Sequence, residues 1–220
     1  MPRIARIVSP GHPHHITQRG NFKQITFVDN KDYLKYLYWL EKYGKEHGLL
    51  ILAFCLIPNH VHLAAVPPEN TSLAKTLKIC HMRYSQYFNK KNNHTGHLWQ
   101  GRFYSCVLDE THLYSVVRYI ENNPVRAELV KKPEDWKWSS ARAHLGKENS
   151  LIPLAEISDF IQVKDWSEYL NTENDLEMTE KIRRHTLTGR PLGNGSFIQG
   201  LEDSFGKRLR ALPKGRPVCK

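Results

Sequence analysis

Two apolar segments joined by a tight turn constrain the fold of this chain more than any other feature. Residues 49–57 form an unbroken apolar run, which is typical of a strand buried on both faces. Pro58 and Asn59 favour a turn. Residues 60–66 resume strand character before Pro67 and Pro68 end it. The sequence therefore predicts an antiparallel hairpin inside a sheet.

The segments around this hairpin predict an alternation of strands and helices. Further strand character occurs at residues 15–19, at residues 25–28, which could extend or pair with the first strand, and at residues 103–108. Capping residues and apolar spacing predict helices at residues 30–47, 72–88 and 110–122. We expect Pro124 to end the last helix, because the residue before a proline avoids the helical region. The predicted fold is α+β, a central antiparallel sheet flanked by helices.

Composition divides the chain near residue 150. Residues 163–180 carry six Asp or Glu against one Lys, whereas residues 181–220 carry ten Lys or Arg against two acids. The residues suited to catalysis all precede residue 131. We therefore expect a catalytic domain over residues 1–150, followed by a helical extension and a basic tail over residues 151–220.

The overall charge indicates the class of partner. A formal net charge of +10 and a pI of about 9.4 favour nucleic acid or an acidic membrane surface. No apolar run reaches the roughly 18 residues that span a bilayer. The first residues lack the apolar core of a signal peptide, so a cytosolic protein is expected. The cysteines form no C-x-x-C pair, and we expect buried thiols rather than disulfides or zinc ligands: Cys55, Cys80, Cys106 and Cys219.

The motif His60-Val61-His62 is the sharpest candidate for chemistry. Residues two apart on a strand point to the same face, so both imidazoles leave the sheet together while Val61 enters the core. Such a pair suits a divalent metal ion. Alone, the motif is a weak signal, and it favours a pair of half-exposed strand histidines over a metal site.

A second candidate lies on the predicted helix 110–122. Tyr119 and Asn123 are four residues apart and share a face. The apolar stripe of this helix is Leu113, Val116 and Ile120, which leaves Tyr119 at its border. A border tyrosine that packs its ring, followed by an asparagine cap before Pro124, is the alternative.

A third feature is a run of 39 residues, 70–108, without Asp or Glu. Cations and aromatic rings alternate along it, which is the composition of a surface that binds single-stranded nucleic acid. Tyr84 and Phe88, at i and i+4 of a helix, could instead be core. Residues 11–21, rich in histidine beside a predicted edge strand, could read bases or form a polar edge. The candidate nucleic-acid contacts are His15, Gln18, Arg19, Lys75, Lys78, Arg83, Lys90, Lys91, Trp99 and Arg102.

Taken in order, these motifs resemble those of the single-tyrosine HUH transposases, and most closely the REP-associated tyrosine transposases. The insertion-sequence branch of that family usually has Gln where this chain has Asn123, and this departure points to the REP-associated branch. The resemblance spans most of the chain. Besides the H-x-H strand and the Tyr-x-x-x-Asn helix, the resembling segments are residues 13–21 (PHHITQRGN), 99–103 (WQGRF), 136–141 (WKWSSA) and 189–193 (GRPLG).

The resemblance implies a fold, a site and an activity. The fold is a compact α+β domain related to the RNA-recognition-motif, or ferredoxin-like, topology. Tyr119 is the implied nucleophile, and His60, His62 and Asn123 are the implied ligands of Mg²⁺ or Mn²⁺. The implied substrate is single-stranded DNA with hairpin-forming REP-like repeats, cleaved and rejoined through a 5′-phosphotyrosine. The basic tail after Lys181 could contact the hairpin or fold over the site.

The chemistry of the residue types agrees with this activity. A phenol titrates near pH 10 and is a weak nucleophile at neutral pH, so it needs a nearby metal ion or base. No glycine loop for nucleotide phosphates occurs, so no nucleotide cofactor is expected. The resemblance favours a monomer, with a dimer as the alternative. Two other functions stay open: a nucleic-acid binder without catalysis, and a phosphodiesterase that uses a metal-bound hydroxide.

Overall fold

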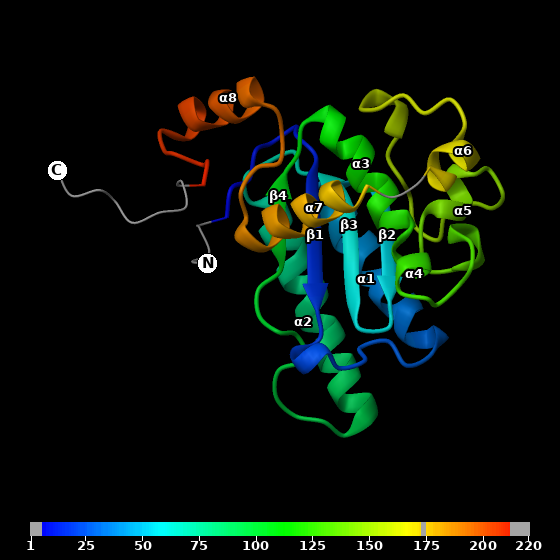
Figure 1. The fold of residues 1–220 in the computed structure, drawn as a ribbon. Coiled ribbons are helices and arrows are strands. Elements are labelled where there is room, and N and C mark those ends of the chain that lie inside the picture. Colours follow the sequence, from blue (N-terminus) through cyan, green and yellow to red (C-terminus); the bar gives the residue numbers. More distant parts are fainter. Residues whose placement is uncertain (1–5, 173–174, 212–220) are drawn as a thin grey trace.

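A four-stranded antiparallel sheet forms the centre of the molecule (Figure 1). The structure, a computed structural model, describes residues 6–172 and 175–211. The spatial order of the strands is β2-β3-β1-β4. Helix α1 (Asn30–Glu46) connects β1 to β2, and α2 (Ser72–Asn92) connects β3 to β4. The strands are β1 (His14–Arg19), β2 (Leu50–Ile57), β3 (His60–Val66) and β4 (Tyr104–Val107). This β-α-β-β-α-β order confirms the predicted RNA-recognition-motif, or ferredoxin-like, topology.

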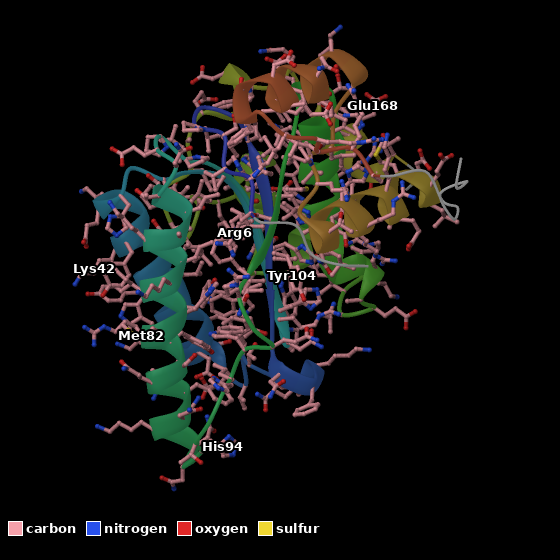
Figure 2. All side chains as sticks on the ribbon, turned by 90° about the vertical axis from the view of Figure 1, so that its left-hand side faces the viewer. Arg6, Lys42, Met82, His94, Tyr104 and Glu168 are labelled. Atoms are coloured by element: carbon pink, nitrogen blue, oxygen red, sulfur yellow. The ribbon has the colours of Figure 1, made fainter. Side chains whose placement is uncertain are left out.

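The two faces of the sheet carry different helices. Viewed along the plane of the sheet, α1 and α2 lie on one side, and α3 (Glu110–Glu121) and α7 (Leu176–Thr188) on the other (Figure 2). Because side chains alternate along a strand, Val61 and Leu63 of β3 pack against α1 and α2. His60 and His62 point to the α3 and α7 side. The alternation thus directs both histidines away from the main core, as predicted.

Shorter helices complete the structure around this frame. The turn α4 (Asn123–Arg126) follows α3, and α5 (Ala141–His144) and α6 (Trp166–Asn171) lie beside the β2 edge (Figure 1). Helix α8 (Gly195–Phe205) lies at the opposite edge, where Leu201 packs with Ile7 and Val107. Three 3-10 turns span Asn21–Lys23, Pro133–Asp135 and Ile157–Asp159.

Most predicted elements are confirmed. The side chains of Asp29 and Asp109 cap α1 and α3, and β2 and β3 form the predicted hairpin. Tyr84 and Phe88 belong to the core, and the thiols of Cys55, Cys80 and Cys106 are free and buried. Cys219 lies outside the described residues.

One predicted strand is wrong. Residues 25–28 form no strand, because β1 already pairs with β3 and β4; the N–H groups of Thr26 and Phe27 instead bind the carbonyl of Pro58. The third helix ends at Glu121, as predicted to within one residue. Pro124 lies in the first turn of the separate helix α4 that follows, where a proline is tolerated because its missing N–H has no helical partner.

Buried histidines make the fold sensitive to acid. Burial lowers the pKa of His81 to about 3 and that of His14 to about 4. An unfolded histidine titrates near 6.5, so below that pH the unfolded chain binds more protons and stability falls. We expect the titration of His81 alone to lower the free energy of unfolding by about 2 kcal/mol at pH 5 relative to pH 7. Urea unfolding at the two pH values measures this difference.

A substitution and a control assign this acid sensitivity. His81→Gln should reduce the difference in free energy of unfolding between pH 7 and pH 5, because Gln cannot titrate. His97→Gln changes an exposed histidine and should leave the difference unchanged. Equal unfolding midpoints for the unmodified chain at both pH values would contradict the prediction.

None of the helices in residues 6–172 and 175–211 combines the length and the apolar character needed to cross a bilayer.

Candidate active site

A cavity of about 390 Å³ lies between the sheet and helices α3, α4 and α7. His60 and His62 enter it from β3, Tyr119 from α3 and Asn123 from α4. Arg19 lines it from the end of β1. The structure therefore brings together the four residues that the sequence suggested for catalysis and metal binding.

The two histidines of β3 are held through the same ring nitrogen. His60 Nδ1 lies 2.6 Å from Asn59 Oδ1, which can only accept, so Nδ1 carries the proton. His62 Nδ1 lies 2.9 Å from His15 Nε2. Burial, together with nearby arginines, lowers the pKa of His60 to about 3, and burial also places the pKa of His62 well below its usual range. Both rings are therefore neutral, the form in which imidazole binds a metal ion.

Tyr119 is held by contacts of its ring and by an interaction of its side chain with Arg183. The ring meets the edges of His15 and His62 at centroid distances of 5.7 and 5.6 Å. The guanidinium of Arg126 lies 3.9 Å from the ring centroid and donates to the Tyr119 carbonyl at 2.8 Å. The Tyr119 side chain is hydrogen-bonded to Arg183 of α7 and raises the pKa of that guanidinium. The hydroxyl thus lies beside a cation on the wall of the cavity.

The charge around the cavity is positive. Arg19, Arg126 and Arg183 line it, and among the described residues none of the lining side chains is acidic. Asn123 is 5% exposed, and its Nδ2 finds no hydrogen-bond partner among the described residues. A cavity with arginines, neutral imidazoles and no carboxylate suits an anion such as a phosphate.

The donor set fits a divalent ion only if Asn123 takes part. No cluster of three His, Cys, Asp or Glu side chains in the described part of the chain could hold a metal ion. His60 and His62 offer two imidazole nitrogens, and the unanchored amide of Asn123 offers an oxygen. All three groups are uncharged, so an anionic substrate oxygen would have to balance the charge of the ion.

The candidate nucleic-acid contacts separate into two groups. His15 is fully buried against His62, the Gln18 amide donates to the Gly101 carbonyl, and Lys91 pairs with Asp29 and Asp32. The Trp99 indole donates to the His81 carbonyl. These side chains are engaged within the fold. The exposed candidates on α2, behind the sheet, are Lys75, Lys78, Arg83 and Lys90.

A second pocket adjoins the first at the end of β1. Residues 96–102, Asn21 and Ser85 line it, and Gln100 lines both pockets. Arg102 is part of this second pocket and is exposed. Of the predicted contacts that are not engaged within the fold, Arg19 therefore lines the first pocket and Arg102 the second.

Sequence reasoning missed several residues of the cavity. Arg126 follows Asn123 by three residues and Tyr119 by seven, spacings that place the three on one helical face, and this pattern is visible in the sequence. Arg183 and Thr186 come from α7, in the segment expected to be an extension. Nothing in the local sequence connects them to β3.

The comparison with family models decides the assignment. A model described as "Transposase IS200 like" matches residues 11–123. This chain belongs to the IS200-like transposases. The matched region begins before β1 and ends at Asn123, so it contains both histidines of β3 and Tyr119.

Individual proteins show further similarities to this chain. A protein of Haemophilus influenzae assigned as a REP-associated tyrosine transposase is 30% identical over 102 residues. The match covers 40% of this chain and 57% of that relative, little more than half its length. A solved REP-associated tyrosine transposase bound to a REP hairpin has a TM-score of 0.53 at 19% identity, over 74% of this chain and 99% of that one. This likeness shows a shared fold.

A further solved structure, of a Deinococcus radiodurans protein assigned as a transposase, has a TM-score of 0.37 and 24% identity. It covers 56% of this chain and 97% of that one.

Proposed function

We propose that this IS200-like transposase cleaves and rejoins single-stranded DNA with Tyr119 as the nucleophile. One observation carries the proposal: Tyr119 shares a cavity with three neutral histidines and three arginines, and none of the described residues that line it is acidic. A cavity of this kind favours a phosphodiester over an uncharged substrate.

His60, His62 and Asn123 are the residues that would hold Mg²⁺ or Mn²⁺. When bound, the ion would supply Lewis-acid polarisation of the scissile phosphate. The neutral state of both imidazoles supports this role, because a protonated ring cannot bind a metal ion.

The side chains of the cavity supply the nucleophile and stabilise the charge that develops in the reaction. The Tyr119 oxygen bonds to the phosphorus and the bond from phosphorus to the 3′ oxygen breaks. The phenolic proton goes to solvent, and the leaving 3′ oxygen takes one up. Arg183 stabilises the developing negative charge on the phenolic oxygen, and Arg126 holds the ring in place. The 5′-phosphotyrosine retains the phosphodiester energy, so a second 3′-OH can attack it and reseal the strand.

The proposed substrate is DNA that carries hairpin-forming, REP-like repeats. A relative with the same fold was solved bound to a REP hairpin. The net charge of +10 and the acid-free run of residues 70–108 support a DNA partner. A chromosomal DNA substrate implies action in the cytoplasm.

The test uses a hairpin-bearing single-stranded DNA oligonucleotide that is labelled on the 3′ side of the expected cut. Incubation with Mn²⁺ or Mg²⁺ should transfer the label to a band of protein size on a denaturing gel. Cleavage without a protein-linked label would favour the metal-hydroxide phosphodiesterase. Binding without cleavage on any such substrate would favour a nucleic-acid binder that lacks catalysis.

An exposed aromatic ring beside the second pocket is predicted to contact a base of single-stranded DNA. Phe22 is 92% exposed and adopts a φ of +51°, an unusual conformation for a bulky residue. It follows Arg19 by three residues, and Asn21 beside it lines the pocket. If a base stacks on Phe22, then Phe22→Ala should weaken single-strand binding by about 1–3 kcal/mol, or roughly 5- to 150-fold in Kd.

Fluorescence anisotropy with a single-stranded oligonucleotide measures this loss. Tyr38→Ala provides the matched control, because Tyr38 is an exposed aromatic residue on α1, behind the sheet. An equal loss in both variants, or no loss with Phe22→Ala, would contradict stacking at this position.

A further inference from the structure

A chain of hydrogen bonds connects helix α7 to the second histidine of β3. Thr186 Oγ1 lies 2.8 Å from the Ile182 carbonyl and 2.7 Å from His15 Nδ1. His15 Nε2 lies 2.9 Å from His62 Nδ1. Thr186 and His15 are separated by 171 residues in the sequence, so the fold alone creates this connection.

Only one placement of protons gives every one of these contacts a hydrogen. A carbonyl oxygen can only accept, so the Thr186 hydroxyl must donate to Ile182. The hydroxyl oxygen then accepts from His15, which places a proton on His15 Nδ1. A neutral imidazole carries one proton, so His15 Nε2 accepts from His62 Nδ1–H. His62 Nε2 is left with its lone pair.

The two histidine rings in this chain of hydrogen bonds are held in one arrangement. The planes of the His15 and His62 rings are within 6° of parallel, and their centroids lie 5.2 Å apart. His15 and Thr186 are 1% and 2% exposed, so water does not compete for their hydrogen bonds. The partner of one ring nitrogen decides which nitrogen of a histidine is protonated.

We propose that Thr186, acting through His15, fixes His62 as the tautomer with a free Nε2 lone pair, and so makes α7 a working part of the candidate metal site. The role of this tautomer in metal binding rests on the proposed function, but the tautomer itself is a property of the metal-free protein. Thr186 and His15 are positioning residues, since neither supplies an atom to the substrate. A segment beyond the IS200-like match at residues 11–123 thereby completes the site.

The chain offers closely matched substitutions for a test. Thr186→Val keeps the shape of the side chain and removes the hydroxyl, so His15 loses the acceptor that holds its proton on Nδ1. Thr186→Ser retains the hydroxyl and should behave like the unmodified chain. Thr188→Val is the control, because the Thr188 hydroxyl makes the same kind of contact, to the backbone carbonyls of Arg184 and His185, and none to a histidine ring.

Nitrogen-15 NMR of the imidazoles in the metal-free chain measures the tautomers directly. We expect His62 to be protonated at Nδ1 in the unmodified chain, in Thr186→Ser and in Thr188→Val. In Thr186→Val a population protonated at Nε2 should appear. Mn²⁺ affinity, measured by calorimetry, should fall about 10- to 100-fold in that variant alone, the usual effect of losing a residue behind a metal ligand.

The outcomes separate this inference from the proposed function. A His62 protonated at Nε2 in the unmodified chain overturns the inference even if Thr186→Val fails to fold. An unchanged tautomer and unchanged Mn²⁺ affinity in a folded Thr186→Val also overturn it. The expected tautomers without any Mn²⁺ or Mg²⁺ binding would support the inference and count against the metal site of the proposed function.

Discussion

Tyr119→Phe is expected to abolish the covalent protein–DNA product and to reduce strand cleavage by about 10⁴-fold or more, the scale seen when an enzyme loses its nucleophile. The substitution removes one oxygen and keeps the ring. The contacts of the ring with His15, His62 and Arg126 therefore persist. We expect the variant to fold and to bind hairpin DNA with unchanged affinity.

A second tyrosine on the same helix provides the control for this experiment. Tyr114 is half-buried on α3, where its ring meets Tyr169, and it does not line the cavity. Tyr114→Phe should cleave like the unmodified chain on the same denaturing gel. Full cleavage by Tyr119→Phe would exclude the tyrosine mechanism and favour attack by a metal-bound hydroxide.

Local patterns in the sequence suffice to predict much of the candidate site. The period of two along β3 directs His60 and His62 to one face, and the structure keeps that arrangement because Val61 packs in the core between them. The helical spacing of Tyr119 and Asn123 survives although the helix is interrupted at Asn122. The turn of α4 continues the same face. Roles assigned to these residues remain predictions until they are tested.

Other parts of the site depend on contacts that no local pattern encodes. Thr186 is a threonine in an amphipathic helix, and nothing near it in the sequence indicates a bond to His15. In the acid-free run of residues 70–108, the composition does not indicate on which side of the sheet each cation lies. Its composition is uniform, but helical periodicity turns Lys75 and Lys78 outward on the layer behind the sheet, while Arg102 lies beside the cavity. Composition therefore predicts the kind of partner better than the face that binds it.

The competition for hydrogen bonds explains the wrongly predicted strand at residues 25–28. Its apolar composition suits a strand, but a strand needs a free sheet edge. β1, beside which the sequence predicts this segment to pair, already has β3 and β4 as partners on its two sides. The Pro58 carbonyl in the β2–β3 turn accepts from both Thr26 and Phe27 instead. The hairpin that constrains the fold thus also determines the path of this segment.

His62→Ala is expected to remove metal binding while leaving DNA binding in place. The substitution deletes one of two imidazole ligands, and we expect Mn²⁺ affinity to fall by more than about 100-fold, beyond the usual effect of residues that lie behind a ligand. A bound ion stabilises the folded state by mass action, by about 2.7 kcal/mol at 100 times its Kd. The unmodified chain should therefore melt at a higher temperature when Mn²⁺ is added, and His62→Ala should not.

The thermal readout tests the metal site independently of catalysis. His47→Ala changes a histidine at the C-terminal end of α1, behind the sheet, and should retain the full Mn²⁺-dependent rise in Tm. Hairpin binding by His62→Ala in metal-free buffer should match that of the unmodified chain, because Arg19 and Arg126 still line the cavity. If His62→Ala showed the same rise in Tm as the unmodified chain, the ion would bind elsewhere, and the polarisation of the scissile phosphate could not be assigned to the histidines of β3.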